Sequence, residues 1–181
     1  MLPEIARAIK GRYPDMVGIN LLSQNCVDAF DLARDLARDF ELDALWADDV
    51  GISSRGVSTL GCALLATELT AESPKVFGGI AFKSQAPEPN PVYAAEIARS
   101  VGVIPTTSGP ATGQALSLEK IRSMSGDGAY PLAVASGMTP ENVAQYAPYL
   151  SHILVSTGIG VDFHHIDEER LNAFISATQN D

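Results

Sequence analysis

The stretch PLAVASGMTPENVAQY, residues 131–146, changes from a strand pattern to a helix pattern in its middle. Its apolar run ends at Gly137, and a helix start follows, with Thr139 as the N-cap and Pro140 in the first helical position. The pattern predicts a buried strand that leads directly into a helix. Because backbone N–H groups gather where a helix begins, the small-residue turn at this junction is a candidate anion site.

The same change of pattern recurs along the chain. Six short runs are largely apolar on both alternating faces, which is typical of parallel strands that are covered on both sides. The predicted strands span residues 16–22, 43–49, 75–82, 101–108, 131–137 and 152–159.

The segments between these strands have helical periodicity or helix-start signals. Asn90, Ser117 and Asp167 are predicted N-caps, because their side chains can accept a hydrogen bond from the first helical turn. The predicted helices span residues 1–15, 25–40, 57–72, 90–101, 117–124, 139–146 and 167–177, and residues 51–56 are predicted as a loop.

Alternating strands and helices predict an all-parallel α/β fold, either a barrel or an open doubly wound sheet. The barrel is favoured, because a dinucleotide-binding sheet would carry G-x-G-x-x-G after its first strand and this chain has SQNC, residues 23–26, in that place. A closed TIM-type barrel uses eight strands in about 250 residues. The expected fold is therefore related to the TIM-type barrel, with only six βα units in this chain.

The composition fits one globular domain that spans residues 1–181. Hydrophobic residues make up 46% and charged residues 19%, and no run of about 18 apolar residues could insert into a bilayer. The formal net charge of −10, without any basic run, argues against nucleic-acid binding. Cys26 and Cys62 form neither a metal-ligand spacing nor a disulfide framework, and the N-terminus has no signal-peptide core, so a cytoplasmic location is expected.

Polar residues collect where the predicted strands end, which is where parallel βα folds carry their functional groups. They are Asn20, Asp48, Asp49, Lys83, Thr106, Thr107, Ser108, Ser136, Ser156, Thr157 and Gly158. Polar residues at strand ends also arise simply because loops meet water, so a functional and a purely structural interpretation both stay open.

Two glycine-rich turns follow the last two strands, ASGMTPEN (135–142) and VSTGIGVD (155–162). Barrels that take phosphorylated ligands often place the phosphate at these two loops. Glycines there would let a ligand approach the backbone closely, although they also serve simply to turn a strand into a helix. A third loop, TTSGPATGQALS (106–117), has hydroxyls and amides suited to a polyol or a phosphate, or covers the barrel mouth without binding anything.

Lys83 and the adjacent pair Asp48 and Asp49 are the charged groups at the strand ends. Lys83 could form a Schiff base, bind a substrate anion or pair with a carboxylate, and anion binding or pairing is favoured. Consecutive strand residues point to opposite faces, so only one aspartate can face the barrel interior. Beside a lysine, that carboxylate could be a general base or bind a sugar hydroxyl or a divalent metal, or it could simply form an ion pair. No metal site is predicted, because His164 and His165 are adjacent in a loop without a carboxylate cluster.

Five segments of the chain match, in order, the pattern of a known family. They are VGINLL (17–22), FGGIAFKSQ (77–85), TSGPATGQALSLEKI (107–121), PLAVASGMTPENV (131–143) and ILVSTGI (153–159). With these segments the chain resembles the BtpA family of TIM-barrel proteins, named for a factor in photosystem I biogenesis. The resemblance covers nearly the whole chain, and Lys83 corresponds to a lysine at a strand end of that family. The ASGMTPENV turn is also similar to turns of phosphate-binding barrels such as phosphoribosylanthranilate isomerase.

The chain departs from that family in three places. Residues 23–25 are Ser-Gln-Asn where the family tends to have Arg-Asn-Asp, and the lysine usual after the last strand is absent around Gly160. The resemblance begins at the family's third strand, so residues 2–13 correspond to its second helix. A six-stranded arc would leave two strand edges unpaired, so we expect either a barrel shortened at its N-terminus or one that associates with another chain, such as a homo-oligomer.

Two functions follow from this pattern. The first is an enzyme or binding protein for a small phosphorylated or ribosyl-type ligand, and the second is a non-catalytic biogenesis or assembly protein on a barrel scaffold. In the first, Asn20, Asp49 and Lys83 are the predicted catalytic residues, and no metal or cofactor is predicted. The predicted ligand-binding residues are Thr107, Ser108, Gly109, Ser136, Gly137, Ser156, Thr157 and Gly158. His152 opens a strand at its far end and is expected to be structural.

Overall fold

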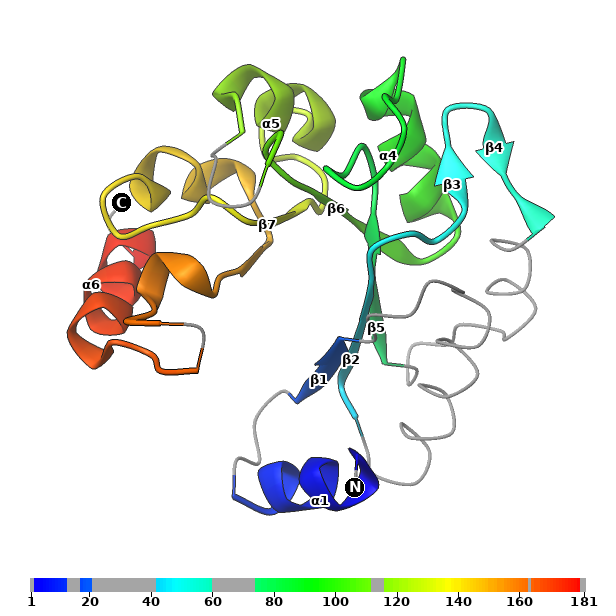
Figure 1. Ribbon diagram of the computed structural model, residues 1–181. Helices are drawn as coiled ribbons and strands as arrows, with labels where there is room; N and C mark the ends of the chain where they lie inside the picture. The colour runs from blue at the N-terminus through cyan, green and yellow to red at the C-terminus, as the bar shows by residue number, and fades with distance from the viewer. Residues whose placement is uncertain are drawn as a thin grey trace.

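A computed structural model describes residues 2–12, 17–20, 42–59, 74–111, 116–162 and 164–179. Six parallel strands form its main sheet in the order β1-β2-β5-β6-β7-β8, so sheet neighbours follow one another along the chain. They are β1 (Gly18–Asn20), β2 (Ala44–Ala47), β5 (Lys75–Gly79), β6 (Val103–Thr107), β7 (Ala133–Ala135) and β8 (His152–Leu154). The sheet curls as a half-barrel with β1 and β8 at its two edges (Figure 1). All six predicted strands and their parallel arrangement are confirmed.

Helices cover the outer face of this sheet (Figure 1). They are α4 (Pro91–Ser100), α5 (Leu118–Ser125) and α6 (Glu168–Gln179). Their apolar side chains share one buried core with outward strand residues; the members include Ala94, Ala98, Ile121, Met124, Phe174, Leu45, Val76, Val103 and Val134. This packing fixes where the carboxyl ends of the strands lie. No helix within the described ranges has the length and apolar character needed to cross a membrane.

A second apolar cluster lies on the inner face of the sheet and is built around Trp46, Phe77 and Phe82. The strand register pairs Trp46 with Phe77 and Phe77 with Ile104, which places these side chains on one face. The Trp46 and Phe82 rings meet edge to face, with centroids 5.2 Å apart. The inner face of the sheet is therefore apolar in the part that leads up to the carboxyl ends of the strands.

Three of the four predicted N-caps are confirmed. The side chains of Asn90, Ser117 and Asp167 each accept a hydrogen bond from the backbone N–H three residues on, at 3.1, 3.2 and 3.0 Å. Helix α1 (Leu2–Arg12) matches the predicted opening helix.

The prediction of an α-helix after β7 is wrong. Two short 3₁₀ helices stand there, η1 (Val143–Gln145) and η2 (Ala147–Tyr149). Thr139 caps neither of them, because its backbone N–H donates to Asn142 Oδ1, 2.9 Å away, in a local turn. Pro148 has no N–H to donate, so the chain cannot continue as an α-helix.

The predicted loop at residues 51–56 and the first residue of the predicted helix 57–72 form a small antiparallel hairpin instead, β3 (Ile52–Ser53) with β4 (Gly56–Val57). Gly56 lies at a φ of 116°, a conformation that favours glycine. The predicted helix at 25–40, most of the one at 57–72, and both cysteines lie outside the described residues.

Candidate functional site

The candidate site is the edge of the sheet where all six strands end, since parallel strands bring their carboxyl ends to one side. Most of the predicted site residues lie on the loops that leave this edge. The loop after β5, residues 80–85, makes hydrogen bonds to the ends of β2, β6 and β7.

Lys83 on this loop connects β6 and β7. Its Nζ donates a hydrogen bond to Ser136 Oγ, 3.0 Å away at the end of β7. Its backbone N–H donates to Ser108 Oγ, 2.8 Å away at the end of β6. The structure thus brings together three residues that were predicted from separate segments, and it places an ammonium group beside the β7 turn.

The hydroxyl groups of Thr107 and Ser108 are engaged within the protein. Both residues are buried; Thr107 Oγ1 donates to the carbonyl oxygen of Ala81, 3.3 Å away, and Ser108 Oγ donates to that of Gly109, 3.0 Å away. These contacts hold the loop that carries Lys83. Direct ligand contact by Thr107, Ser108 or Gly109 stays a prediction.

Ala81 has a φ of 50°, which residues with a β-carbon rarely adopt. Its carbonyl oxygen accepts a second hydrogen bond from Lys120 Nζ, 2.9 Å away. Burial lowers the pKa of Lys120, which reaches back from the first turn of α5. Lys120 was not among the predicted site residues. The available signal was a basic residue in the first turn of a predicted helix, where the helix dipole favours acidic ones.

Gln85 joins the ends of β2 and β5 and was also missed. Its Nε2 donates to the carbonyl oxygens of Gly79, 2.8 Å away, and Asp48, 3.1 Å away, and its Oε1 accepts from the Phe82 N–H at 3.0 Å. Glycine at position 79 lets β5 lie close to the carbonyl group of Asp48, because a β-carbon on Gly79 would overlap the Asp48 carbonyl oxygen. The sequence holds no signal for Gln85, since the loop geometry determines its partners.

Asp48 and Asp49 have different partners. Asp48 Oδ1 accepts a hydrogen bond from Trp46 Nε1, 2.8 Å away, beside the inner cluster. The carboxylate of Asp49 instead accepts the Gly51 N–H at 2.8 Å and closes an exposed turn. The Asp48 carboxylate therefore lies beside the inner apolar cluster, and the Asp49 carboxylate does not. Asn20 pairs in register with Trp46, which places it on the inner face of the edge strand β1.

The turn after β7 is sharp and locally cross-linked. Ser136 and Gly137 both have positive φ, 88° and 75°. The Asn142 side chain holds the turn at two points. Its Nδ2 donates to the Gly137 carbonyl oxygen at 2.9 Å, and its Oδ1 accepts from the backbone N–H of Thr139. A serine in this conformation is strained, which is common where a backbone is shaped for a ligand.

The turn after β8 packs directly on the β7 turn. It contains the 3₁₀ helix η3 (Thr157–Ile159). Gly158 lies so close to Met138 that a β-carbon on Gly158 would overlap the Met138 carbonyl oxygen. The close packing of two strand-end loops therefore requires glycine at position 158.

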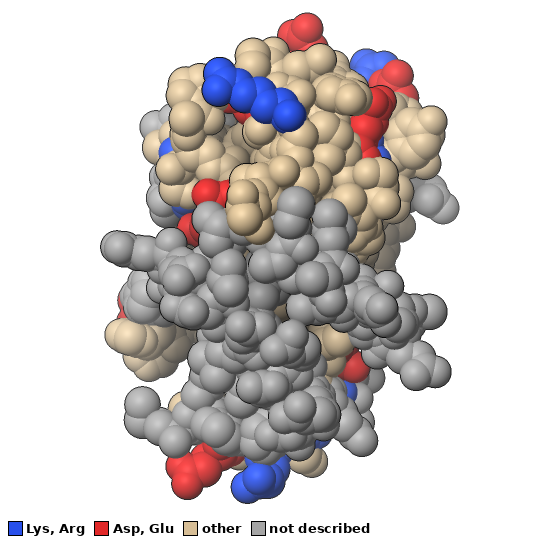
Figure 2. Space-filling model, turned by 90° about the vertical axis from the view of Figure 1, so that its right-hand side faces the viewer, with Lys and Arg blue, Asp and Glu red and all other residues tan. Residues whose placement is uncertain are grey.

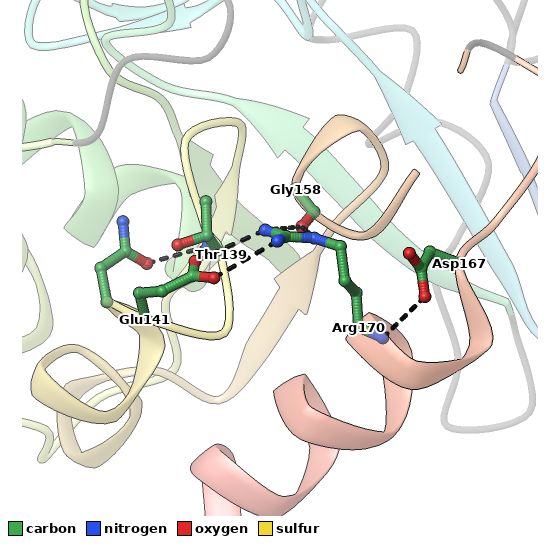
Figure 3. A network of polar contacts seen from close by, with 6 residues as sticks. Thr139, Glu141, Gly158, Asp167 and Arg170 are labelled. Carbon is green, nitrogen blue, oxygen red and sulfur yellow. Dashed lines mark hydrogen bonds and ion pairs between the residues drawn. The ribbon is translucent and has the colours of Figure 1, made fainter. Parts of the chain in front are cut away.

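Arg170 of α6 holds this pair of turns together (Figure 3). Its Nε and Nη2 donate to the Gly158 carbonyl oxygen at 3.2 and 3.1 Å, and its Nη1 lies 3.3 Å from Glu141 Oε1. A hydrogen bond from the Thr139 side chain, together with Arg170, lowers the pKa of the Glu141 carboxyl group. Glu141 therefore stays ionised and keeps Arg170 between the two turns.

The two turns have backbone donors that no described residue uses. The N–H groups of Gly137, Met138, Thr157 and Gly158 have no acceptor within the described ranges. Gly137 and Met138 are buried, and a buried N–H without an acceptor is rare because its lost hydration is not replaced. These donors are expected to meet a ligand or bound water.

No group of three or more His, Cys, Asp or Glu side chains among the described residues is arranged to hold a metal ion. Figure 2 shows a face on which charged side chains of both signs are scattered around the described surface without a basic patch. Chemically, the strand ends offer backbone donors at β7 and β8 and an ammonium group from Lys83.

No protein-family model matches this chain, and no curated protein matches its sequence. Solved structures do match its fold. Phosphoribosylanthranilate isomerase from Thermotoga maritima superposes with a TM-score of 0.63 at 16% identity, over 98% of this chain and 79% of that one. The enzyme of the same name from Thermus thermophilus gives 0.63 at 15%, over 97% and 78%. Thiamine phosphate pyrophosphorylase from Pyrococcus furiosus gives 0.51 at 10%, over 98% and 89%.

These similarities establish the fold alone. The chain has the α/β fold of the TIM-barrel type, as the sequence predicted, with six parallel strands in a curled sheet. The specific resemblance to the BtpA family stays a prediction.

Proposed function

We propose that this chain binds a small phosphorylated molecule and holds its phosphate at the turns after β7 and β8. The observation that carries the proposal is the set of four backbone N–H groups, on Gly137, Met138, Thr157 and Gly158, that lack acceptors within the described residues. They lie on two loops whose backbones touch at Gly158 and Met138. A phosphate has several acceptor oxygens, so it can take donors from both loops at once.

Lys83 and the exposed hydroxyls of the β8 turn complete the proposed phosphate site. Lys83 Nζ stands 3.0 Å from Ser136 Oγ, so its charge lies beside the β7 turn. Ser156 and Thr157 are exposed, and their side chains make no hydrogen bond within the described ranges. A charged donor combined with neutral donors gives stronger hydrogen bonds to phosphate than neutral donors alone.

Two similarities support the proposal. The structural neighbours include enzymes whose names specify phosphoribosyl and thiamine phosphate compounds. The segments that resemble the BtpA family include both turns. We therefore propose a BtpA-like protein, with the rest of the ligand lying over Lys83 and the inner side chains of Asn20 and Asp48. Asp49 belongs to this group only if its exposed turn changes on binding.

Thermal unfolding with inorganic phosphate and ribose 5-phosphate tests the proposal. A ligand at about 100 times its dissociation constant stabilises the folded state by about 2.7 kcal/mol, which raises the melting temperature. Thr157→Asp places a negative charge at the proposed site on an exposed side chain, and we expect it to abolish the shift. Asn172→Asp adds the same charge on the exposed surface of α6 and should keep the shift.

An absent shift with both probes in the wild type would contradict phosphate binding. An equal shift in Thr157→Asp would show that phosphate binds elsewhere. Phosphorus NMR of the bound sugar phosphate separates the two functional classes, because an enzyme converts or isomerises its ligand with time whereas a non-catalytic assembly protein leaves it unchanged.

We also propose that the chain associates with itself or with another chain through the edges of the sheet. Within the described residues, β1 and β8 each pair with a strand on one side only. Open parallel edges carry backbone donors and acceptors that favour pairing. Light scattering across a range of concentrations should show a dimer or larger species, and a well-folded, strictly monomeric protein would contradict this part of the proposal.

A further inference from the structure

We propose that a second pocket, between the loop after β5 and the start of α5, binds the carboxylate of a small apolar molecule through Lys120. The pocket has a volume of about 720 Å³, which is in the range of small-molecule sites. It lies beside the β5 and β6 loops and shares Lys83 with the proposed phosphate site, but no residue of the β7 and β8 turns lines it. The inference rests on Lys120 and the apolar lining, which the proposed phosphate site does not use.

The walls of this pocket are mainly apolar. Its apolar lining residues include Phe82, Pro87, Pro91, Pro110 and Leu116. Each proline fixes its own φ, which reduces the backbone freedom of this wall. A preformed apolar wall fits a compact hydrocarbon body.

Most of the polar side chains around the pocket already have partners. Gln85 bonds three backbone groups, and Ser108 bonds the backbone of Lys83 and Gly109. Ser117 caps α5, and the Glu88 carboxylate accepts the Ser54 and Asn90 N–H groups at 3.0 and 2.9 Å. These groups shape the pocket, and their main hydrogen bonds are used within the protein.

Lys120 differs from these groups. Its ammonium group has three donors, and one of them bonds the Ala81 carbonyl oxygen at 2.9 Å. No carboxylate pairs with it among the described residues, although its side chain is half-buried and lines the pocket. Partial burial without a counter-ion makes an anionic partner more favourable there than for a lysine in water.

The pocket favours a carboxylate over a phosphate. Lys83 and Lys120 line the pocket with positive charge, and Glu88 lines it with negative charge. The Ser54 and Asn90 hydrogen bonds outweigh the effect of burial and lower the pKa of Glu88, so it stays ionised. The described lining therefore carries one net positive charge, which a monocarboxylate balances, whereas a phosphate dianion would exceed it and be repelled by Glu88.

Isothermal titration calorimetry with cyclohexanecarboxylate tests the inference. We expect saturable binding to the wild type and no binding of cyclohexanecarboxamide, which has the same shape without the charge. Lys120→Met should weaken carboxylate binding at least about tenfold, because the site loses the half-buried ammonium group that no carboxylate pairs with among the described residues. Lys75→Met, the same replacement at an exposed position at the start of β5, should leave the affinity unchanged.

Further variants keep the inference testable if Lys120→Met fails to fold. Ala86 is exposed and lines the pocket, so Ala86→Phe should fill the space and block binding without touching Lys120. Thr157→Asp should leave carboxylate binding intact, which separates this pocket from the proposed phosphate site. No carboxylate binding in the wild type, equal affinity for the carboxamide, or tighter binding of inorganic phosphate that depends on Lys120 would overturn the inference.

Discussion

The loops after β7 and β8 and the loops after β5 and β6 leave the same edge of the sheet, but different interactions hold them together. The β7 and β8 turns touch through backbone at Gly158 and Met138 and leave N–H groups unused. The β5 and β6 loops are held by side chains, chiefly Gln85 and Lys120, which bond carbonyl oxygens. In the β7 and β8 turns, contact through the backbone leaves N–H donors for an anion. In the β5 and β6 loops, side chains use most of their donors within the protein, and the Lys120 ammonium group lies beside an apolar wall.

Gly158→Ala should have the largest effect, because it separates the two turns that touch through backbone. The added β-carbon would overlap the Met138 carbonyl oxygen, and we expect a loss of about 3 kcal/mol in the free energy of unfolding. Denaturant unfolding followed by circular dichroism measures it. Gly11→Ala is the matched control, since no atom lies within 4 Å of a β-carbon at that position of α1. The control should be stabilised by about 0.5 to 1 kcal/mol.

Gln85→Ala tests the region held by side chains. It removes three hydrogen bonds between the ends of β2 and β5, so we expect a loss of about 2 kcal/mol in stability. Gln145→Ala on η1 is the control, because the Gln145 side chain is exposed and makes no hydrogen bond within the described residues. Equal stability of the two variants would show that Gln85 does not hold these loops.

The contrast between the regions also explains which parts were predictable from the sequence. The six strands and the glycine turns follow from local patterns, since apolar runs and small residues are read along the chain itself. Lys120 bonds Ala81, 39 positions away, and Gln85 bonds Asp48, 37 positions away, and only the folded chain brings these groups together.

One local error has an equally local physical cause. The helix expected after β7 is replaced by 3₁₀ turns, because Asn142 bonds the backbone of Thr139 and Gly137 and Pro148 interrupts further helix. The position of the two aspartates could not be derived from the sequence, because alternation says that one of two neighbours faces inward but not which one. The structure places the Asp48 carboxylate against Trp46, and a catalytic role for Asp49 stays a prediction.

Arg170→Met should have a moderate effect, and it tests whether the β7 and β8 turns also need a side chain. It removes the bonds to the Gly158 carbonyl oxygen and to Glu141, for a loss of about 1 to 1.5 kcal/mol, because the pair is partly exposed. Arg122→Met breaks the more exposed pair with Asp127 and should cost less stability than Arg170→Met. If both variants lose the same stability, the turns are held by backbone packing alone.

His152 should produce the smallest effect, and it contrasts the two ends of β8. It stands at the amino end of the strand, away from Gly158, with its ring edge-on to Phe77 at a centroid distance of 4.9 Å. Burial, and secondarily the charge of Lys75, lowers the pKa of His152. The unfolded chain therefore takes up a proton first as the pH falls below about 6.5, so stability decreases from there down to the folded pKa.

Melting temperatures measured between about pH 7.5 and about pH 5.5 check this prediction. His152→Asn keeps a polar group near Ser151 but cannot titrate, so its stability should fall less steeply over this range than that of the wild type. His164→Asn removes an exposed histidine that follows the carboxyl end of β8 in the chain, and it serves as the control. If His152→Asn keeps the full slope, the pH dependence has another source and the amino end of β8 does not contribute to it. A reduced slope with unchanged phosphate binding would instead show that β8 has a structural end at His152 and a ligand-binding end at Gly158.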